Sequence, residues 1–113
     1  MRISGRDAVK ILEKVKSKVV LYRKDNTDKF WSYKLVSGSR SEFAFDPTTK
    51  TKLVVRFDQL PPSIVGITDV NNIVGDSVST ALGRVFTGGK YKAKYTALVE
   101  TEEALLLMIS VLK

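Results

Sequence analysis

The sequence predicts one α+β domain: a helix near the N-terminus, an antiparallel β-sheet of about five strands, and a buried C-terminal helix packed on one face of that sheet. Two observations predict this class. Apolar residues recur at helical spacing near the start and fill the last stretch, whereas the segments between them alternate apolar and polar residues as half-buried strands do. A length of 113 residues, without a linker, internal repeat or low-complexity tract, suits a single domain covering residues 1–113.

The N-terminal helix is expected over residues 4–18. Ser4 is a favoured N-cap, and Asp7 three residues later makes a variant of the capping box, with Asp in place of Glu. The residues of its apolar stripe are Ala8, Ile11, Leu12, Val15 and Val19. The lysines that fall mostly on the other side are Lys10, Lys14, Lys16 and Lys18. That side is either a solvated surface or a surface that faces phosphate groups, and the helix alone does not decide between them.

The next four strands are expected to form an antiparallel meander with one apolar face. Their expected ranges are 19–23, 29–36, 42–46 and 52–57, where β-branched and aromatic residues dominate and polar turns intervene. The side chains expected on the apolar face are Trp31, Tyr33, Leu35, Phe43, Phe45, Leu53, Val55 and Phe57. Some of the aromatic residues could stack on nucleobases, but their alternation with polar residues favours a role in the core.

The segment after the meander is harder to assign. Leu60-Pro61-Pro62 ends the meander, because proline cannot continue a central ladder. Residues 63–75 fit short edge strands, a partly buried loop or a short helix, and residues 76–84 fit one or two helical turns. A fifth strand is expected over residues 91–99, and it leads directly into the terminal helix.

The terminal helix is expected over residues 101–113. Thr101 can cap its N-terminus, and Glu102 and Glu103 suit the positive end of the helix dipole. Residues 104–112 are apolar except for Ser110, so the helix needs burial on more than one side. We expect the rest of the chain to cover it, with a partner protein or a second copy as the alternative cover. The apolar run is too short to span a bilayer, which takes ~20 residues.

The composition excludes several kinds of catalytic and metal site. The chain has no cysteine and no histidine, which rules out disulfides, thiolate metal sites, ordinary zinc sites and triads built on histidine. Gly88-Gly89-Lys90 is not a nucleotide-binding P-loop, because Tyr91 follows the lysine where Ser or Thr is required. The sequence leaves enzymatic activity uncertain and favours its absence, with no cofactor and no metal.

The acidic residues show no spacing typical of a metal site. The candidates considered are Glu42, Asp46, Asp58, Asp69, Asp76 and Glu100. Most of the aspartates lie in segments with turn or loop composition. A metal-dependent hydrolase that uses loop aspartates is therefore the least favoured of three interpretations.

The charge of the chain favours nucleic acid as a partner. Lys and Arg total 19 against 12 Asp and Glu, a net charge of +7. Lys90, Lys92 and Lys94 alternate, so a strand places them on one face, where phosphates would relieve their mutual repulsion. The other residues assigned to this phosphate-binding set are Arg84, Lys52 and Arg56. The alternative is that these lysines protect an edge strand from aggregation.

The leading interpretation is a basic, non-catalytic nucleic-acid-binding domain that contacts the phosphate backbone, of DNA more than of RNA, and no membrane. The alternative is a protein-interaction or oligomerisation module, in which the apolar C-terminal helix pairs with a protein partner or forms a homodimer. The first residues lack the apolar core of a signal peptide, so we expect a cytoplasmic protein.

A family resemblance supports a nucleic-acid setting. Phe43-Ala44-Phe45, then Leu53-Val54-Val55-Arg56-Phe57, then Leu60-Pro61-Pro62, and a closing stretch from Tyr91 to Leu105 make up the pattern. Over residues 40–112 this pattern resembles small uncharacterised α+β accessory domains that accompany predicted restriction-type nucleases. The resemblance brings no catalytic signature, so no functional residue is carried over. It implies a free-standing adaptor or binding module.

Overall fold

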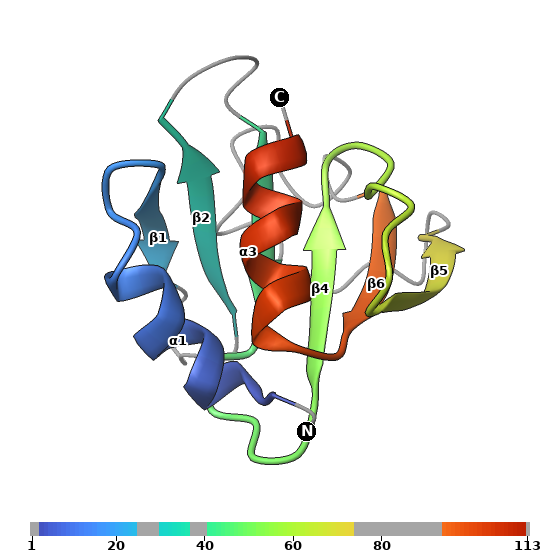
Figure 1. The fold of residues 1–113 in the computed structure, drawn as a ribbon, viewed down its shortest axis with the longest axis horizontal. Helices are drawn as coiled ribbons and strands as arrows, with labels where there is room; N and C mark the ends of the chain where they lie inside the picture. The colour runs from blue at the N-terminus through green and yellow to red at the C-terminus, as the bar shows by residue number, and fades with distance from the viewer. Residues whose placement is uncertain (1–2, 25–29, 37–40, 74–93, 113) are drawn as a thin grey trace.

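The computed structural model describes residues 3–24, 30–36, 41–73 and 94–112. Within them the chain forms a six-stranded antiparallel sheet with two helices against one of its faces (Figure 1). The elements are α1 (Gly5–Glu13), β1 (Val19–Lys24), β2 (Trp31–Leu35), β3 (Glu42–Phe45), β4 (Leu53–Phe57), β5 (Ile67–Asn72), β6 (Tyr95–Val99) and α3 (Glu102–Val111). The predicted α+β class and both terminal helices are confirmed, and the sheet has one strand more than expected.

The strands lie in the order β1-β2-β3-β4-β6-β5. The first four form the predicted meander, and β6 pairs with β4, so that Val55 lies opposite Phe45 on one side and Ala97 on the other. The additional strand is β5, an edge strand in the stretch for which the sequence left three alternatives open. The helical turns expected at 76–84 and the first part of the expected fifth strand, 91–93, lie outside the described residues.

Helix α1 begins as predicted but ends at Glu13 rather than Lys18. At its start the Ser4 hydroxyl oxygen accepts a hydrogen bond from the Asp7 N–H at 3.2 Å, and the Asp7 carboxylate accepts one from the Ser4 N–H at 2.9 Å. At the other end the Lys18 carbonyl already accepts the Val36 N–H at 3.0 Å, as part of the β1–β2 ladder. The chain must therefore leave the helix early enough to turn back along the sheet.

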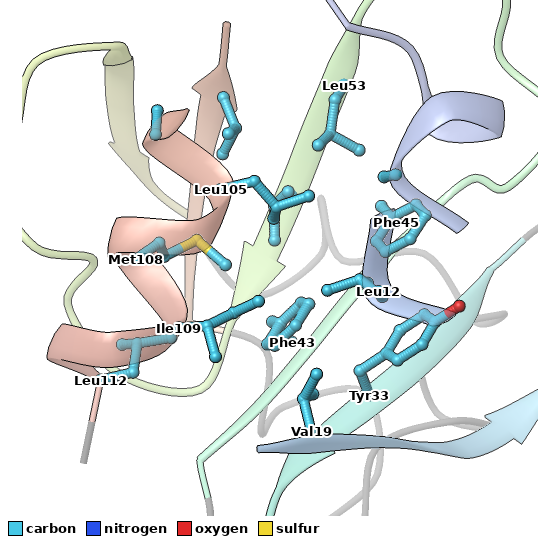
Figure 2. Packing of buried hydrophobic residues seen from close by; sticks show 14 of the residues in the cluster. Leu12, Val19, Tyr33, Phe43, Phe45, Leu53, Leu105, Met108, Ile109 and Leu112 are labelled. Carbon is cyan, nitrogen blue, oxygen red and sulfur yellow. The ribbon is translucent and has the colours of Figure 1, made fainter. Parts of the chain in front are cut away.

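Helix α3 is buried on the side that faces the sheet. The residues buried there are Ala104, Leu105, Met108, Ile109 and, just past the helix, Leu112. Figure 2 shows Leu105 and Ile109 directed from α3 toward the sheet, with Ile109 beside Phe43. Leu107 and Val111 are 48% and 43% exposed, so the expected burial on more than one side is not reached. None of the described helices is long and apolar enough to cross a membrane.

The sheet face away from the helices is also covered at its centre. Ser32 and Ala44 are fully buried there, Leu98 is 9% exposed, and Phe30, just before β2, is 4% exposed. The sequence pattern predicted a meander with one apolar face, and it did not predict that small residues of the other face are buried as well. Serine and alanine are too small for alternation to mark them as buried, so the pattern missed the cover.

The packing of α3 generates the first prediction. Leu105 is fully buried, so Leu105→Ala should lower the free energy of unfolding by ~2–5 kcal/mol through lost burial and the cavity left behind. Leu107→Ala, on the exposed side of the same helix, should change it by about 0.5 kcal/mol or less. Urea denaturation measures both. Equal losses would contradict this packing, and stability that rises with protein concentration would reveal association.

The contact between α1 and the β3–β4 turn generates the second prediction. The Gly5 N–H donates to the Thr49 hydroxyl at 2.7 Å, and a Cβ at Gly5 would lie 1.9 Å from the Asp46 carbonyl oxygen. Gly5→Ala should therefore destabilise the protein by about 1–3 kcal/mol, although alanine is the better helix former. The exposed Arg6→Ala is the matched control in thermal unfolding. A Gly5→Ala variant as stable as the parent would show that the turn can move away.

The stacked core aromatics generate the third prediction. The Tyr33 ring stacks on Phe45, with 5.4 Å between centroids and 3° between planes, and burial raises the pKa of Tyr33 from 10.0 to about 12. A raised pKa in the folded state means that stability is lost as pH rises from 10 toward 12, because only the unfolded chain then ionises readily. Tyr33→Phe should lose less stability than the parent over this pH window. If the free energy of unfolding falls equally with pH in both proteins, the raised pKa does not belong to Tyr33.

Candidate nucleic-acid interface

The structure describes three residues of the predicted phosphate-binding set: Lys52, Arg56 and Lys94. The members that lie outside the described residues are Arg84, Lys90 and Lys92. The two strands concerned, β4 and β6, are direct neighbours, with Arg56 opposite Thr96. Because Leu53, Val55 and Phe57 point into the core, the alternation puts Lys52 and Arg56 on the face away from the helices, and Lys94 follows Thr96 onto the same face.

Lys94 belongs to the interior of the sheet rather than to its edge. Its N–H donates to the Phe57 carbonyl at 2.8 Å, and its carbonyl accepts the Ile73 N–H at 2.8 Å. Both sides of its backbone are therefore paired, and β6 lies between β4 and β5. An exposed lysine at this position has no open backbone edge to protect, which removes the edge-protection explanation for Lys94.

The three described cations do not form one cluster. Strands β4 and β6 are antiparallel, so Lys52 and Lys94, which precede them, lie at opposite ends of the pair, roughly 20 Å apart along the strands. Arg56 lies closer to Lys94, about 7 Å away along the strand direction on the neighbouring strand. Arg56 and Lys94 can thus contact one segment of a ligand, and Lys52 contacts a more distant part.

Arg56 is half-buried beside an aromatic ring. Its guanidinium carbon lies 4.9 Å from the centre of the Phe30 ring, and its Nη1 donates to the Val54 carbonyl at 3.4 Å. Burial lowers the pKa of Arg56, and the charge of Asp46 opposes this shift only in part. The positive charge is therefore poorly solvated, and an anion placed against it would stabilise it.

Two carboxylates lie on the same face between the basic residues. Glu42, 4% exposed, is opposite Lys34 on β2, and its N–H donates to the Asp58 carboxylate at 3.1 Å. The Asp58 N–H in turn donates to the Glu42 carbonyl at 3.3 Å. The acids therefore interrupt the face and divide its cations into two areas, one over β4 and β6 and one over β1 and β2.

The described aspartates are not arranged as a metal site. The Asp46 carboxylate accepts hydrogen bonds from the N–H of Thr48 at 2.8 Å and from its hydroxyl at 2.6 Å, which holds the β3–β4 turn. Asp69 lies on exposed β5 at a φ of 52°. Among the residues that the structure describes, no three His, Cys, Asp or Glu side chains gather closely enough to hold a metal ion.

An aromatic–cation group at the other end of the sheet was not predicted from the sequence. The Tyr22 ring has the Arg23 guanidinium 4.9 Å from its centre and the Lys34 ammonium 4.7 Å from it. Nearby, the Lys24 ammonium lies 4.3 Å from the centre of the Trp31 ring. With the pair made by Arg56, the described residues contain four such pairs.

A β-bulge creates this group. The register of β1 against β2 shifts between Leu21 and Arg23, so Tyr22 is the extra residue in the ladder. Arg23 then lies opposite Ser32 on the face away from the helices, next to the tyrosine ring rather than on the opposite face. The available sequence signal was that Tyr22, Arg23 and Lys24 are adjacent, but strict alternation would have placed Tyr22 and Arg23 on opposite faces of the sheet.

The predicted core aromatics are confirmed apart from one. Tyr33, Phe43 and Phe45 are buried, and both phenylalanine rings stack on Tyr33, whereas Trp31 is only half-buried under Lys24. A comparison with models of known families, with curated proteins and with solved structures finds no match to this chain. Any functional argument therefore depends on the chain's own residues.

Proposed function

We propose that this protein is a small basic domain that binds nucleic acid, with DNA preferred to RNA, and that it catalyses no reaction. The contacts are made to phosphates by cations on the sheet face away from the helices. The observation that carries the proposal is Lys94, an exposed lysine on a fully paired interior strand next to the half-buried Arg56. Neither cation is explained by protection of an edge, and both lie where one anionic backbone can reach them.

The overall charge supports this proposal. A net charge of +7 on 113 residues draws polyanions to the surface, and binding then gains free energy by releasing the counterions of the phosphates. The resemblance of residues 40–112 to accessory domains of predicted restriction-type nucleases fits the same setting. Contacts of this kind set position on the backbone and carry little base preference.

A second candidate function is a protein-interaction module, favoured by the exposed side of α3. Leu107 and Val111 lie one turn apart and are 48% and 43% exposed, and Leu60 is 64% exposed. A shallow hollow lies between this side and the loop after β4, with Leu60, Pro62 and Val111 among its lining residues. Apolar side chains gathered in this way are typical of a contact surface for a partner or a second copy.

The salt dependence of binding tests the proposal. Changing Lys90, Lys92 and Lys94 together to Gln should flatten the slope of log K against log salt by roughly 2–3 units on duplex DNA and weaken all sequences alike. The charge-matched control changes Lys10, Lys14 and Lys18 to Gln. These three lysines lie on or just after α1, in the helix layer, so the control variant should keep the parental slope. Fluorescence anisotropy with labelled duplexes between ~50 and 200 mM salt measures both.

Two outcomes would contradict this prediction. A parent protein that shows no binding at ~50 mM salt would exclude nucleic acid and leave the interaction module. A loss confined to the control variant would move the contact surface to the helix layer.

A further inference from the structure

Tyr22, Arg23 and Lys34 form a compact group at the β1–β2 end of the sheet. The Arg23 and Lys34 cations both lie within 5 Å of the centre of the Tyr22 ring, so they also lie close to each other. They come from two strands, and the β-bulge in β1 brings the consecutive Tyr22 and Arg23 together. The group therefore combines an aromatic surface with two positive charges that one ligand can contact at once.

The position of the Lys34 ammonium is informative. In the register Lys34 lies opposite the carboxylate-bearing Glu42, yet its ammonium lies over the Tyr22 ring. Within the described part of the chain, neither Lys34 nor Arg23 forms an ion pair with a carboxylate. Two like charges beside one ring repel each other, and an anion held between them would remove that repulsion.

We propose that this group is a base-stacking subsite for single-stranded nucleic acid, in which one base stacks at Tyr22 while Arg23 and Lys34 contact the flanking phosphates. The inference rests on the proposed function and names the form of nucleic acid that it takes. Aromatic rings in a positively charged groove are how proteins hold single strands, because every base has a π-face and stacking tolerates any sequence. Bases of a duplex are already stacked on each other and are not available to a ring on a sheet surface.

The location fits a ligand that also reaches the phosphate-contacting residues. Arg23, Ser32, Ala44 and Arg56 lie in one cross-strand row, so Arg23 and Arg56 are separated by three strand spacings, about 14 Å. Both lie on the face away from the helices. Ser32 and Ala44 between them are fully buried, so a single strand that contacts both Arg56 and the Tyr22 subsite would pass over the covered centre of the face.

The experiment compares three probes of equal length: a labelled single-stranded oligothymidylate, its oligouridylate counterpart, and an abasic sugar–phosphate strand. Tyr22→Leu should weaken binding of the first two about five- to one-hundred-fold, the range expected for losing one stacked base. Binding of the abasic strand should not change. Because no charge is lost, the salt slope should stay at the parental value. Tyr22→Phe keeps the ring and should bind within about twofold of the parent.

The charge contacts are tested separately, and each failure has its own signature. Lys34→Gln should flatten the single-strand salt slope by about 0.7 and weaken the abasic strand as well. If Tyr22→Leu binds every probe like the parent while the parent still binds duplex DNA, the stacking subsite is wrong and the phosphate-binding face stands. If the parent binds no nucleic acid, both proposals fail. Poly-glutamate that competes as well as the oligonucleotides would overturn the subsite in favour of an acidic peptide.

A control for folding accompanies these measurements. Tyr22 is half-buried, so Tyr22→Leu could lower stability as well as affinity. Each variant must show the circular dichroism spectrum of the parent and must unfold well above the assay temperature. Leu21→Val changes the same strand at a residue that is 40% exposed and lies opposite the core residue Tyr33, on the helix-facing side of the sheet, so it should leave binding of all three probes unchanged.

Discussion

The burial of α3 against β3 and β4 is the constraint on which the rest of the structure depends. Leu105, Met108 and Phe43, all labelled in Figure 2, are fully buried. Val55 and Phe57 on β4 are fully buried as well. A strand that slipped by one residue would turn its own inward-facing residues outward. The apolar contact therefore fixes the register, and the register decides that the alternate residues of the same strands, Arg56 among them, lie on the opposite face.

The same constraint explains why the cations divide into two areas. The central strands are covered on both faces, as the full burial of Ser32 and Ala44 shows, so these two residues cannot contact a ligand directly. Among the residues that the structure describes, the cations of this face lie toward its two ends. At the β4–β6 end they are Lys52, Arg56 and Lys94; at the β1–β2 end Arg23 and Lys34 accompany an aromatic ring. One end is suited to phosphates alone, and the other to phosphates together with a base.

The sequence was sufficient for whatever depends on periodicity and local chemistry, and insufficient for whatever depends on register. Period-two alternation located the four meander strands, and the Ser4 capping box is present as expected. The edge strand β5 has a single buried residue, Ile67, so it carries almost no alternation to read. The Tyr22 group needs both a bulge and a cross-strand neighbour from β2, and neither is visible in one segment of sequence. The uniform apolar character of α3 likewise concealed which side stays exposed.

The two candidate functions are compatible because they use opposite layers of the molecule. The helices cover one face of the sheet, and the exposed Leu107 and Val111 lie in that layer, whereas the cations lie on the other face (Figure 1). Two copies joined through α3 in a symmetric contact would point their basic faces away from each other. Such a dimer would offer two separate binding faces to one nucleic acid or to two, and association through α3 would then raise avidity without changing either site.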